Sequence, residues 1–245
     1  MPGFLDVICA ERKVDRGGQG LVEWPAIDLL DVEAILMHEN ALTSIPASID
    51  RFEALRLLDL GHNRLLSLPS TIGRIATLEI LYAGHNRLSE VPESLGDLTR
   101  LTYLNLDDNG LRALPSSLGK LESLIDLRLF GNGLTHLPAA LGDLRELRSL
   151  SVRDNRLEAL PETIGNLSML RHLDVRDNHL VSLPSGAQHL TALESIDLRG
   201  NRLTKVPPLL AALPSLRYID LRWNPLRHVP GWLRDRSSDG CIVWV

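Results

Sequence analysis

An asparagine recurs every 23 residues along this 245-residue chain, and a proline follows each of these asparagines six residues later. The nine copies contain no insertion or deletion, and aliphatic residues occupy fixed places around each asparagine. Residues 55–69, a typical copy, read L-x-x-L-x-L-x-x-N-x-L-x-x-L-P. A fixed period of this length indicates a repeat architecture, in which each unit buries its apolar side chains only by stacking on its neighbours. The asparagines are Asn40, Asn63, Asn86, Asn109, Asn132, Asn155, Asn178, Asn201 and Asn224.

The short L-x-L segment of each copy, for example Leu104 and Leu106, has the period of two that is typical of a β-strand. We therefore expect each repeat to add one strand to a parallel sheet, with its leucines facing inward. The asparagine amide at the end of the strand can satisfy backbone groups that would otherwise be buried without partners. After the proline, the chain is expected to return along the opposite side in a short helical or irregular turn.

Together these residues resemble the leucine-rich repeat family. The L-P-x-x-[IL]-G-x-L segment of a 23-residue unit is similar to the intracellular subclass that includes the Ras-pathway scaffold and plant Ras-group proteins, and the near-consensus repeats resemble bacterial members. The resemblance covers roughly residues 21–236. It implies an α/β solenoid, a right-handed horseshoe with a parallel β-sheet on its concave face and short helical or irregular turns on its convex face. It also implies that the concave face binds another protein.

Both ends of the chain depart from the repeat, as terminal repeats usually do. Residues 1–31 contain only a degenerate half-repeat and are predicted to form an N-terminal cap. Residues 32–238 hold the nine repeats, and residues 239–245 are predicted to form a C-terminal capping segment of the same elongated domain. Cys9 and Cys241 would lie at opposite ends of the solenoid, too far apart for a disulfide, so we expect both to be reduced thiols.

The composition argues against several classes of protein. A net charge of −5 does not suit a general nucleic-acid binder, whose affinity comes from neutralising phosphates. No apolar run approaches the length of a membrane span, and the first residues lack the pattern of a cleaved signal peptide. We therefore predict a cytoplasmic protein, or one exported without a cleaved signal. The sequence does not determine the oligomeric state, and a monomer is favoured.

No arrangement of residues points to catalysis, a cofactor or a metal. His62 and His85 occupy equivalent places in adjacent repeats, but two histidines without a third ligand do not suit a metal site. Cys9 has no base nearby in the sequence that could activate it. We therefore predict a chain that is not an enzyme and binds no cofactor. The alternative is an accessory or ligase-type effector that acts with a catalytic domain not present in this chain.

The strand side chains that alternate with the inward leucines must determine which partner the chain binds. Half of the ten aromatic residues fall at these outward positions or at their rim, where a leucine core does not need them. Because tyrosine and tryptophan are frequent in binding hot spots, these residues predict a partner site. The alternative is that the rings only pack on one another along the sheet. The first half of the face is predicted to form an apolar and aromatic patch of Leu57, Ile80, Tyr82, Tyr103, Ile125 and Phe130.

Four arginines occupy the same place in consecutive repeats, and aspartates stand two residues before three of them. The two rows could neutralise each other as a surface network, or the guanidinium groups could bind carboxylates or phosphates of a partner. We predict a non-catalytic interaction module, in signalling or as a host-directed effector, that binds a protein on its concave face. The predicted partner-binding residues are Leu57, Ile80, Tyr82, Tyr103, Ile125, Arg128, Phe130, Arg153, Arg176, Arg199, Tyr218, Arg222 and Trp223.

Overall fold

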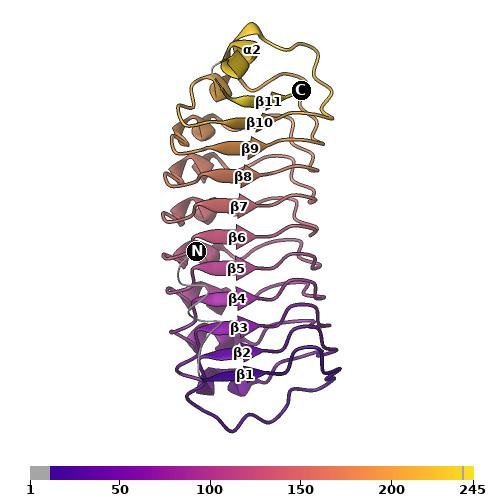
Figure 1. The fold of residues 1–245 in the computed structure, drawn as a ribbon, viewed down its shortest axis with the longest axis vertical. Coiled ribbons are helices and arrows are strands. Elements are labelled where there is room, and N and C mark those ends of the chain that lie inside the picture. The colour runs from indigo at the N-terminus through magenta and orange to yellow at the C-terminus, as the bar shows by residue number, and fades with distance from the viewer. Residues whose placement is uncertain (1–11, 239) are drawn as a thin grey trace.

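The computed structural model describes residues 12–238 and 240–245, in which 11 strands form one parallel sheet (Figure 1). Each strand is hydrogen-bonded only to the strands that come before and after it in the sequence. The solenoid expected from the repeat pattern is confirmed. The strands are β1 (Lys13–Asp15), β2 (Ala34–Leu36), β3 (Leu57–Asp59), β4 (Ile80–Tyr82), β5 (Tyr103–Asn105), β6 (Asp126–Arg128), β7 (Ser149–Ser151), β8 (His172–Asp174), β9 (Ser195–Asp197), β10 (Tyr218–Asp220) and β11 (Ile242–Trp244).

The register of the sheet places equivalent residues of successive repeats side by side. Leu58 pairs with Leu81, and Leu81 pairs in turn with Leu104. The repeat pattern predicted nine strands, whereas the described residues form 11. The two additional strands, β1 and β11, lie in the segments predicted to be caps. Both lack the asparagine motif, so the period could not reveal them.

Short 3-10 helices form the opposite, convex side of each coil. Each helix follows the proline of its repeat, and Pro115, for example, has the extended conformation (φ −68°, ψ 148°) just before its helix. The helices are η1 (Ala47–Arg51), η2 (Ser70–Arg74), η3 (Glu93–Asp97), η4 (Ser116–Lys120), η5 (Ala139–Asp143), η6 (Glu162–Asn166), η7 (Ser185–His189) and η8 (Pro208–Ala211).

The glycine of the repeat allows these helices to stack closely. A Cβ atom at Gly119 would overlap the backbone carbonyl of Ala140 in the next coil. Gln188 takes this place in its repeat, and the helix that follows, η8, is shorter than the others and begins at Pro208. Asp50 takes the same place in the first repeat, and the helix that follows it, η2, has the regular length of five residues. The same close approach to the next coil is found at Gly73, Gly96, Gly142 and Gly165.

A continuous aliphatic core fills the space between the sheet and the 3-10 helices, from Ile27 to Cys241. At the C-terminal end, helix α2 (Gly231–Ser238) covers the last coil by inserting Leu233, which is 1% exposed. Arg236 of α2 stands where the repeats have leucine, and its guanidinium donates hydrogen bonds to backbone carbonyls of the last coil, including that of Ala211 at 2.9 Å. Cys241 is a buried free thiol, whereas Cys9 lies outside the described residues.

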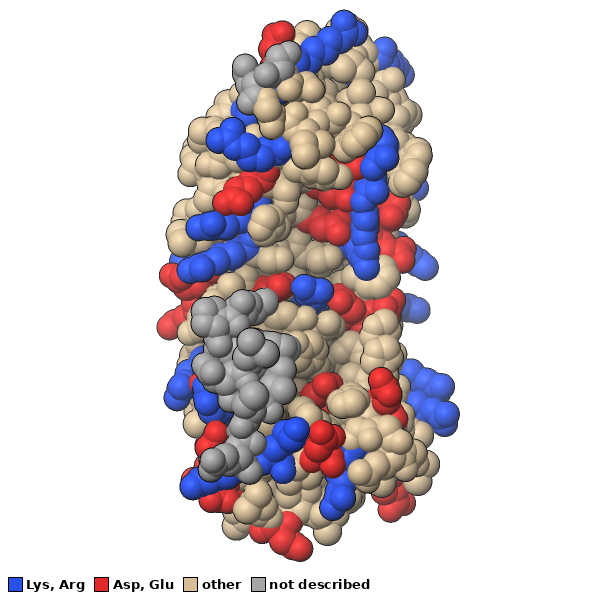
Figure 2. All heavy atoms as spheres, in the orientation of Figure 1, with Lys and Arg blue, Asp and Glu red and all other residues tan. Residues whose placement is uncertain are grey.

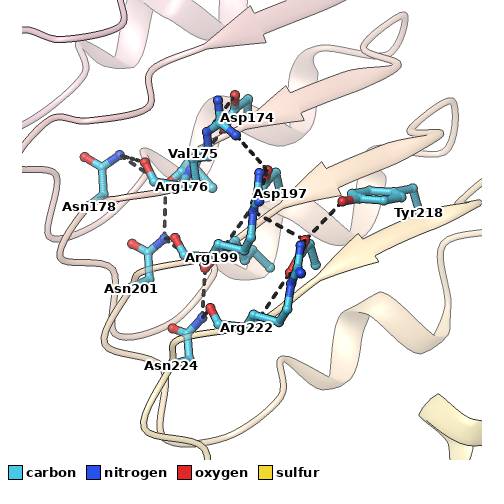
Figure 3. A network of polar contacts seen from close by, with 12 residues as sticks. Asp174, Val175, Arg176, Asn178, Asp197, Arg199, Asn201, Tyr218, Arg222 and Asn224 are labelled. Atoms are coloured by element: carbon cyan, nitrogen blue, oxygen red, sulfur yellow. Dashed lines mark hydrogen bonds and ion pairs between the residues drawn. The ribbon is translucent and has the colours of Figure 1, made fainter. Parts of the chain in front are cut away.

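The recurring asparagine side chains connect successive coils. The Asn155 amide donates to the carbonyls of Val152 (3.0 Å) and Arg153 (3.1 Å) in its own coil and to Leu129 (2.9 Å) in the preceding one. Its Oδ1 accepts a hydrogen bond from the backbone N–H of Leu134 at 3.0 Å. One side chain thus satisfies four backbone groups of two coils, as the sequence predicted, and Figure 3 shows part of the same ladder at Asn178, Asn201 and Asn224.

The residue just before each of these asparagines has a left-handed backbone conformation. The nine φ angles lie between 47° at Asp108 and 66° at Gly131. This turn directs the asparagine side chain back across the end of the strand. It also places the side chain of the residue before the asparagine at the rim of the concave face. These residues are Glu39, His62, His85, Asp108, Asp154, Asp177 and Trp223.

We expect Asn155→Ala to destabilise the fold by about 3 kcal/mol, because the substitution leaves several buried backbone groups without partners. Asn166→Ala is the matched control, since Asn166 is exposed at the end of η6 and should change the free energy of unfolding by less than about 0.5 kcal/mol. Urea unfolding of both variants measures the difference. Equal effects of the two substitutions would contradict a structural role for the ladder.

Candidate functional site on the concave face

The concave face is lined by the first and third residues of each strand and by the residue two positions further along. Across β2–β5 the first row is apolar and buried, with exposed fractions of 2% at Leu57, 4% at Ile80 and 6% at Tyr103. Tyr82 is only partly buried, and its ring centroid lies 4.8 Å from that of Tyr103. Burial of Leu57, Ile80 and Tyr103 leaves these side chains little surface for a partner. A hollow of about 350 Å³, lined in part by His38, Asp59 and Tyr82, opens beside them.

Two residues predicted to belong to the apolar patch lie outside this cluster. Ile125 is half-buried at the residue before β6, and its backbone carbonyl accepts hydrogen bonds from Arg148 and Ser149. Phe130 follows β6, and the Arg153 guanidinium lies 4.0 Å from the centroid of its ring. Phe130 thus forms a cation–π pair with an arginine and is separate from the row of aliphatic residues.

The character of the face changes at β6. Asp126 is the register neighbour of Tyr103 and is also buried, at 5% exposure. Desolvation raises the pKa of its carboxyl group, and Arg128 counters this effect with its Nε 3.5 Å from Asp126 Oδ1. The Arg128 guanidinium is exposed and also lies 5.7 Å from the centroid of the Tyr103 ring. From this strand onward, polar and charged side chains line the face.

The predicted rows of arginine and aspartate form a continuous network on β8–β10 (Figure 3). Three guanidinium groups alternate with three carboxylates, and the basic side chains are visible as a blue column beside red carboxylates in Figure 2. The ion-pair distances are 3.6 Å for Arg176–Asp174, 3.8 Å for Arg176–Asp197, 2.6 Å for Arg199–Asp197, 3.3 Å for Arg199–Asp220 and 2.7 Å for Arg222–Asp220.

The two ends of this network differ in charge balance. Desolvation raises the pKa of the Asp220 carboxyl, but hydrogen bonds from Arg222 and Tyr218 outweigh that effect, and its pKa falls below the usual value. The Tyr218 hydroxyl donates to Asp220 Oδ2 at 3.0 Å. The pKa of Asp174 shifts in the opposite direction, because desolvation and the charge of Asp197 raise it to about 7. The carboxylate at the β8 end is therefore the least compensated of the row.

A hollow of about 440 Å³ opens on the concave face over β6–β9. Its lining includes the small side chains of Ser149, Ser151 and Ser195, which leave space between larger neighbours. Ser195 is hydrogen-bonded to His172, with 2.9 Å between Oγ and Nδ1. The charged and aromatic residues on its lining are Asp107, Arg128, Phe130, Arg153, His172, Asp174, Asp197 and Tyr218.

A second exposed group lies at the C-terminal end of the face. Trp223 is 72% exposed, although its left-handed backbone (φ 61°) is unusual for a bulky residue. The guanidinium groups of Arg199 and Arg222 lie 5.8 Å and 5.6 Å from its ring. Arg222 also lies 5.0 Å from the ring of Trp244, a residue that the repeat pattern could not identify because β11 is outside it.

Among the described residues, no group of three or more histidine, cysteine, aspartate or glutamate side chains could hold a metal ion. The His62 and His85 rings are stacked with centroids 4.0 Å apart, and His85 Nδ1 lies 3.2 Å from Asp108 Oδ2. Within the same part of the chain, no helix is both long and apolar enough to cross a membrane.

We expect Asp174→Asn to raise the melting temperature at pH 8 more than at pH 4.5. A pKa of about 7, against the usual 3.8, means that the folded state keeps a proton that the unfolded state releases. The free energy of unfolding therefore falls as the pH rises from about 4 to about 7, and the asparagine variant lacks this loss. A gain of ~1 kcal/mol corresponds to ~2–4 °C in a chain of this size.

Thermal unfolding at the two pH values measures this effect, with Asp154→Asn as the control. Asp154 is exposed at the rim, so its substitution should change the melting temperature equally at both pH values. A variant of Asp174 that is less stable than the parent at pH 8 would contradict the assignment of an uncompensated carboxylate.

Comparison with known proteins places this geometry in a family. The model for leucine-rich repeat regions matches residues 20–153 and 135–229. Among solved structures, a leucine-rich-repeat protein of Leptospira interrogans is 25% identical, with a TM-score of 0.71, over 92% of this chain and 70% of that one. No curated protein matches the chain.

Two plant receptors in complex with a second molecule are also similar. The plant peptide hormone receptor RGFR1, in complex with RGF2, is 30% identical with a TM-score of 0.74 over 81% of this chain and 33% of the receptor. The ectodomain of the Arabidopsis thaliana receptor kinase GASSHO1/SCHENGEN3, in complex with CASPARIAN STRIP INTEGRITY FACTOR 2, is 27% identical with a TM-score of 0.72 over 89% and 30%. The chain thus spans about a third of each plant receptor. By its matched repeats and its fold, the chain belongs to the leucine-rich repeat family.

Proposed function

We propose that this chain is a non-catalytic interaction module that binds an extended segment of a protein partner in the hollow over β6–β9. The observation that carries the proposal is the hollow itself, an open depression of about 440 Å³ whose lining is mostly polar. Arg128 and Arg153 border it on β6 and just after β7, and the serines leave room for main-chain groups of a ligand. The similar plant receptor RGFR1, solved in complex with RGF2, supports this proposal by analogy.

Most of the remaining predicted site residues take one of three roles in this proposal. Arg176, Arg199 and Arg222 are already paired with aspartates, so they orient a partner by their field and form few new ion pairs. Tyr218 and Trp223 extend the contact area toward the C-terminal end of the face. Leu57, Ile80 and Tyr103 support the sheet from their buried positions.

The finer interpretations from the sequence remain predictions. They are membership of the intracellular 23-residue subclass, a bacterial origin, a cytoplasmic location and a monomeric state. A role as a signalling scaffold and a role as a host-directed effector both fit a partner-binding concave face. The assignment of residues 1–31 and 239–245 to caps is likewise part of this proposal.

A large side chain placed in the hollow should strongly weaken partner binding and leave the coil folded. In Ser151→Trp, a large ring would occupy the space beside Arg128 and Asp174, the register neighbours of Ser151. Ser116→Trp, at the exposed start of η4 on the convex side, is the matched control. Peptides selected from a displayed random library on the immobilised parent chain should bind Ser116→Trp normally and Ser151→Trp at least about tenfold more weakly.

Melting curves of both variants establish that each is folded before binding is compared. Selected peptides that bind the two variants equally well would place the binding surface outside the hollow and overturn the proposal.

A further inference from the structure

We propose that the hollow selects an extended peptide that carries one acidic and one basic side chain, the acidic one held by Arg153 and the basic one by Asp174. This inference rests on the proposed function, because it assumes that the hollow binds a peptide segment. It adds the chemistry of the partner. That chemistry follows from Arg153, just after β7, and Asp174 of β8, the two charged groups that the internal network compensates least.

Arg153 differs from the other arginines of its row. Arg176, Arg199 and Arg222 each have an aspartate two residues earlier on their own strand, whereas Arg153 has Ser151 there. Among the described residues, no carboxylate forms an ion pair with Arg153. Its guanidinium instead lies over the Phe130 ring, at 4.0 Å from the centroid. Stacking holds the guanidinium plane in one orientation while its N–H donors remain available to a carboxylate.

Asp174 is the acidic counterpart at the same end of the network. Its nearest cation is Arg176, with Nε 3.6 Å from Oδ2, and its Oδ1 accepts only a long hydrogen bond of 3.3 Å from the Arg176 backbone. Asp197, one strand further, receives three hydrogen bonds of 2.6–3.1 Å from the side chain of Arg199. Ser151, the register neighbour of Asp174 on β7, supplies no charge. The charges of Arg153 and Arg199 lower the pKa of Asp174, but desolvation and Asp197 outweigh them, and among the described residues Arg153 forms no ion pair with this carboxylate. A cation from a partner would therefore supply what the network lacks at this position.

The spacing of these two groups suits an extended chain. Arg153 and Asp174 belong to adjacent coils, whose strands lie ~4.8 Å apart, and their places along the strand differ by two residues, or ~6.7 Å. The two backbone positions are thus separated by about 8 Å. Side chains two residues apart in an extended peptide lie on one face at ~6.7 Å spacing. We therefore expect the acidic and basic residues of the partner to be separated by a single residue.

The space between the two groups accommodates a main chain. Ser149, Ser151 and Ser195 line the hollow with short hydroxyl-bearing side chains, and its volume of about 440 Å³ is large enough for a few residues. The hydroxyl groups can donate to or accept from peptide groups of a ligand. The hollow thus combines a cation, an anion and a polar floor within two neighbouring coils.

The test measures the fluorescence anisotropy of short labelled peptides, with blocked ends, bound to the full chain at low ionic strength and at pH 8, where the Asp174 carboxyl is ionised. The probe has the core Glu-Ser-Lys between glycine and serine residues. The comparison peptides have Gln-Ser-Lys, Glu-Ser-Gln and Gln-Ser-Gln in its place. We expect loss of either charge to weaken binding about fivefold to tenfold, as expected for partly desolvated ion pairs.

Two variants assign each charge to its partner. In Arg153→Gln, the preference for Glu over Gln should disappear while the preference for Lys remains, and Asp174→Asn should show the converse. Arg156→Gln and Asp154→Asn are matched controls, because both residues are exposed outside the hollow and should leave both preferences unchanged. A preference for glutamate that persists in Arg153→Gln, or one for lysine that persists in Asp174→Asn, would overturn the assignment.

Further outcomes separate this inference from the proposed function. The selected peptides could bind Ser151→Trp more weakly than the parent chain while the four synthetic peptides bind the parent equally well. That result would refute the charge pairing and leave the proposed function standing. Complete displacement of the probe by a mixture of free glutamate and lysine at the same concentration would show a small-molecule site and overturn the extended-peptide ligand. Equally strong binding of the selected peptides to the parent chain and to Ser151→Trp would refute the proposed function itself.

Discussion

The fold depends on one repeated interaction, the set of hydrogen bonds that each asparagine side chain makes at the end of its strand. A coil of this solenoid must turn sharply beside an apolar core, where its buried peptide groups need hydrogen-bond partners. The amide satisfies carbonyls of its own coil and of the preceding coil and accepts an N–H from that coil, as at Asn155. Each coil is thus joined to its neighbour by bonds that involve no side chain of the concave face.

This ladder also explains why the concave face can carry binding residues. Because the asparagines fix the register, equivalent residues of successive repeats stand in straight rows on the sheet. The glycines on the convex side keep the coils closely stacked on that side of the solenoid. A row therefore behaves as a series of fixed sites in which one residue type can be exchanged without moving the next. The change from Tyr103 to Asp126, and that from Phe130 to Arg153, are exchanges of this kind.

Much of this organisation could be predicted from the sequence. The period identifies the strand, the turn and the rows of Arg153 and Asp174, because each follows from spacing alone. Spacing does not reveal how far side chains are buried. Leu57, Ile80 and Tyr103 were therefore expected to be exposed, whereas the structure buries them. Strands β1 and β11 were missed because their spacings of 21 and 24 residues from the neighbouring strands fall outside the period. The stacking of Arg153 on Phe130 depends on side-chain conformation, which the repeat does not encode.

The proposed binding site is marked by Arg153, the one arginine of its row that has no ion pair among the described residues. Arginine Nε–Hε resonances in a nitrogen–proton NMR spectrum of the full chain test this assignment most directly, during titration with a peptide selected on the parent chain. We expect the Arg153 resonance to shift most, the resonances of the paired guanidinium groups of Arg199 and Arg222 to shift little, and that of Arg156 not to move. An unchanged Arg153 resonance at saturation, with the largest shift at Arg156, would contradict it.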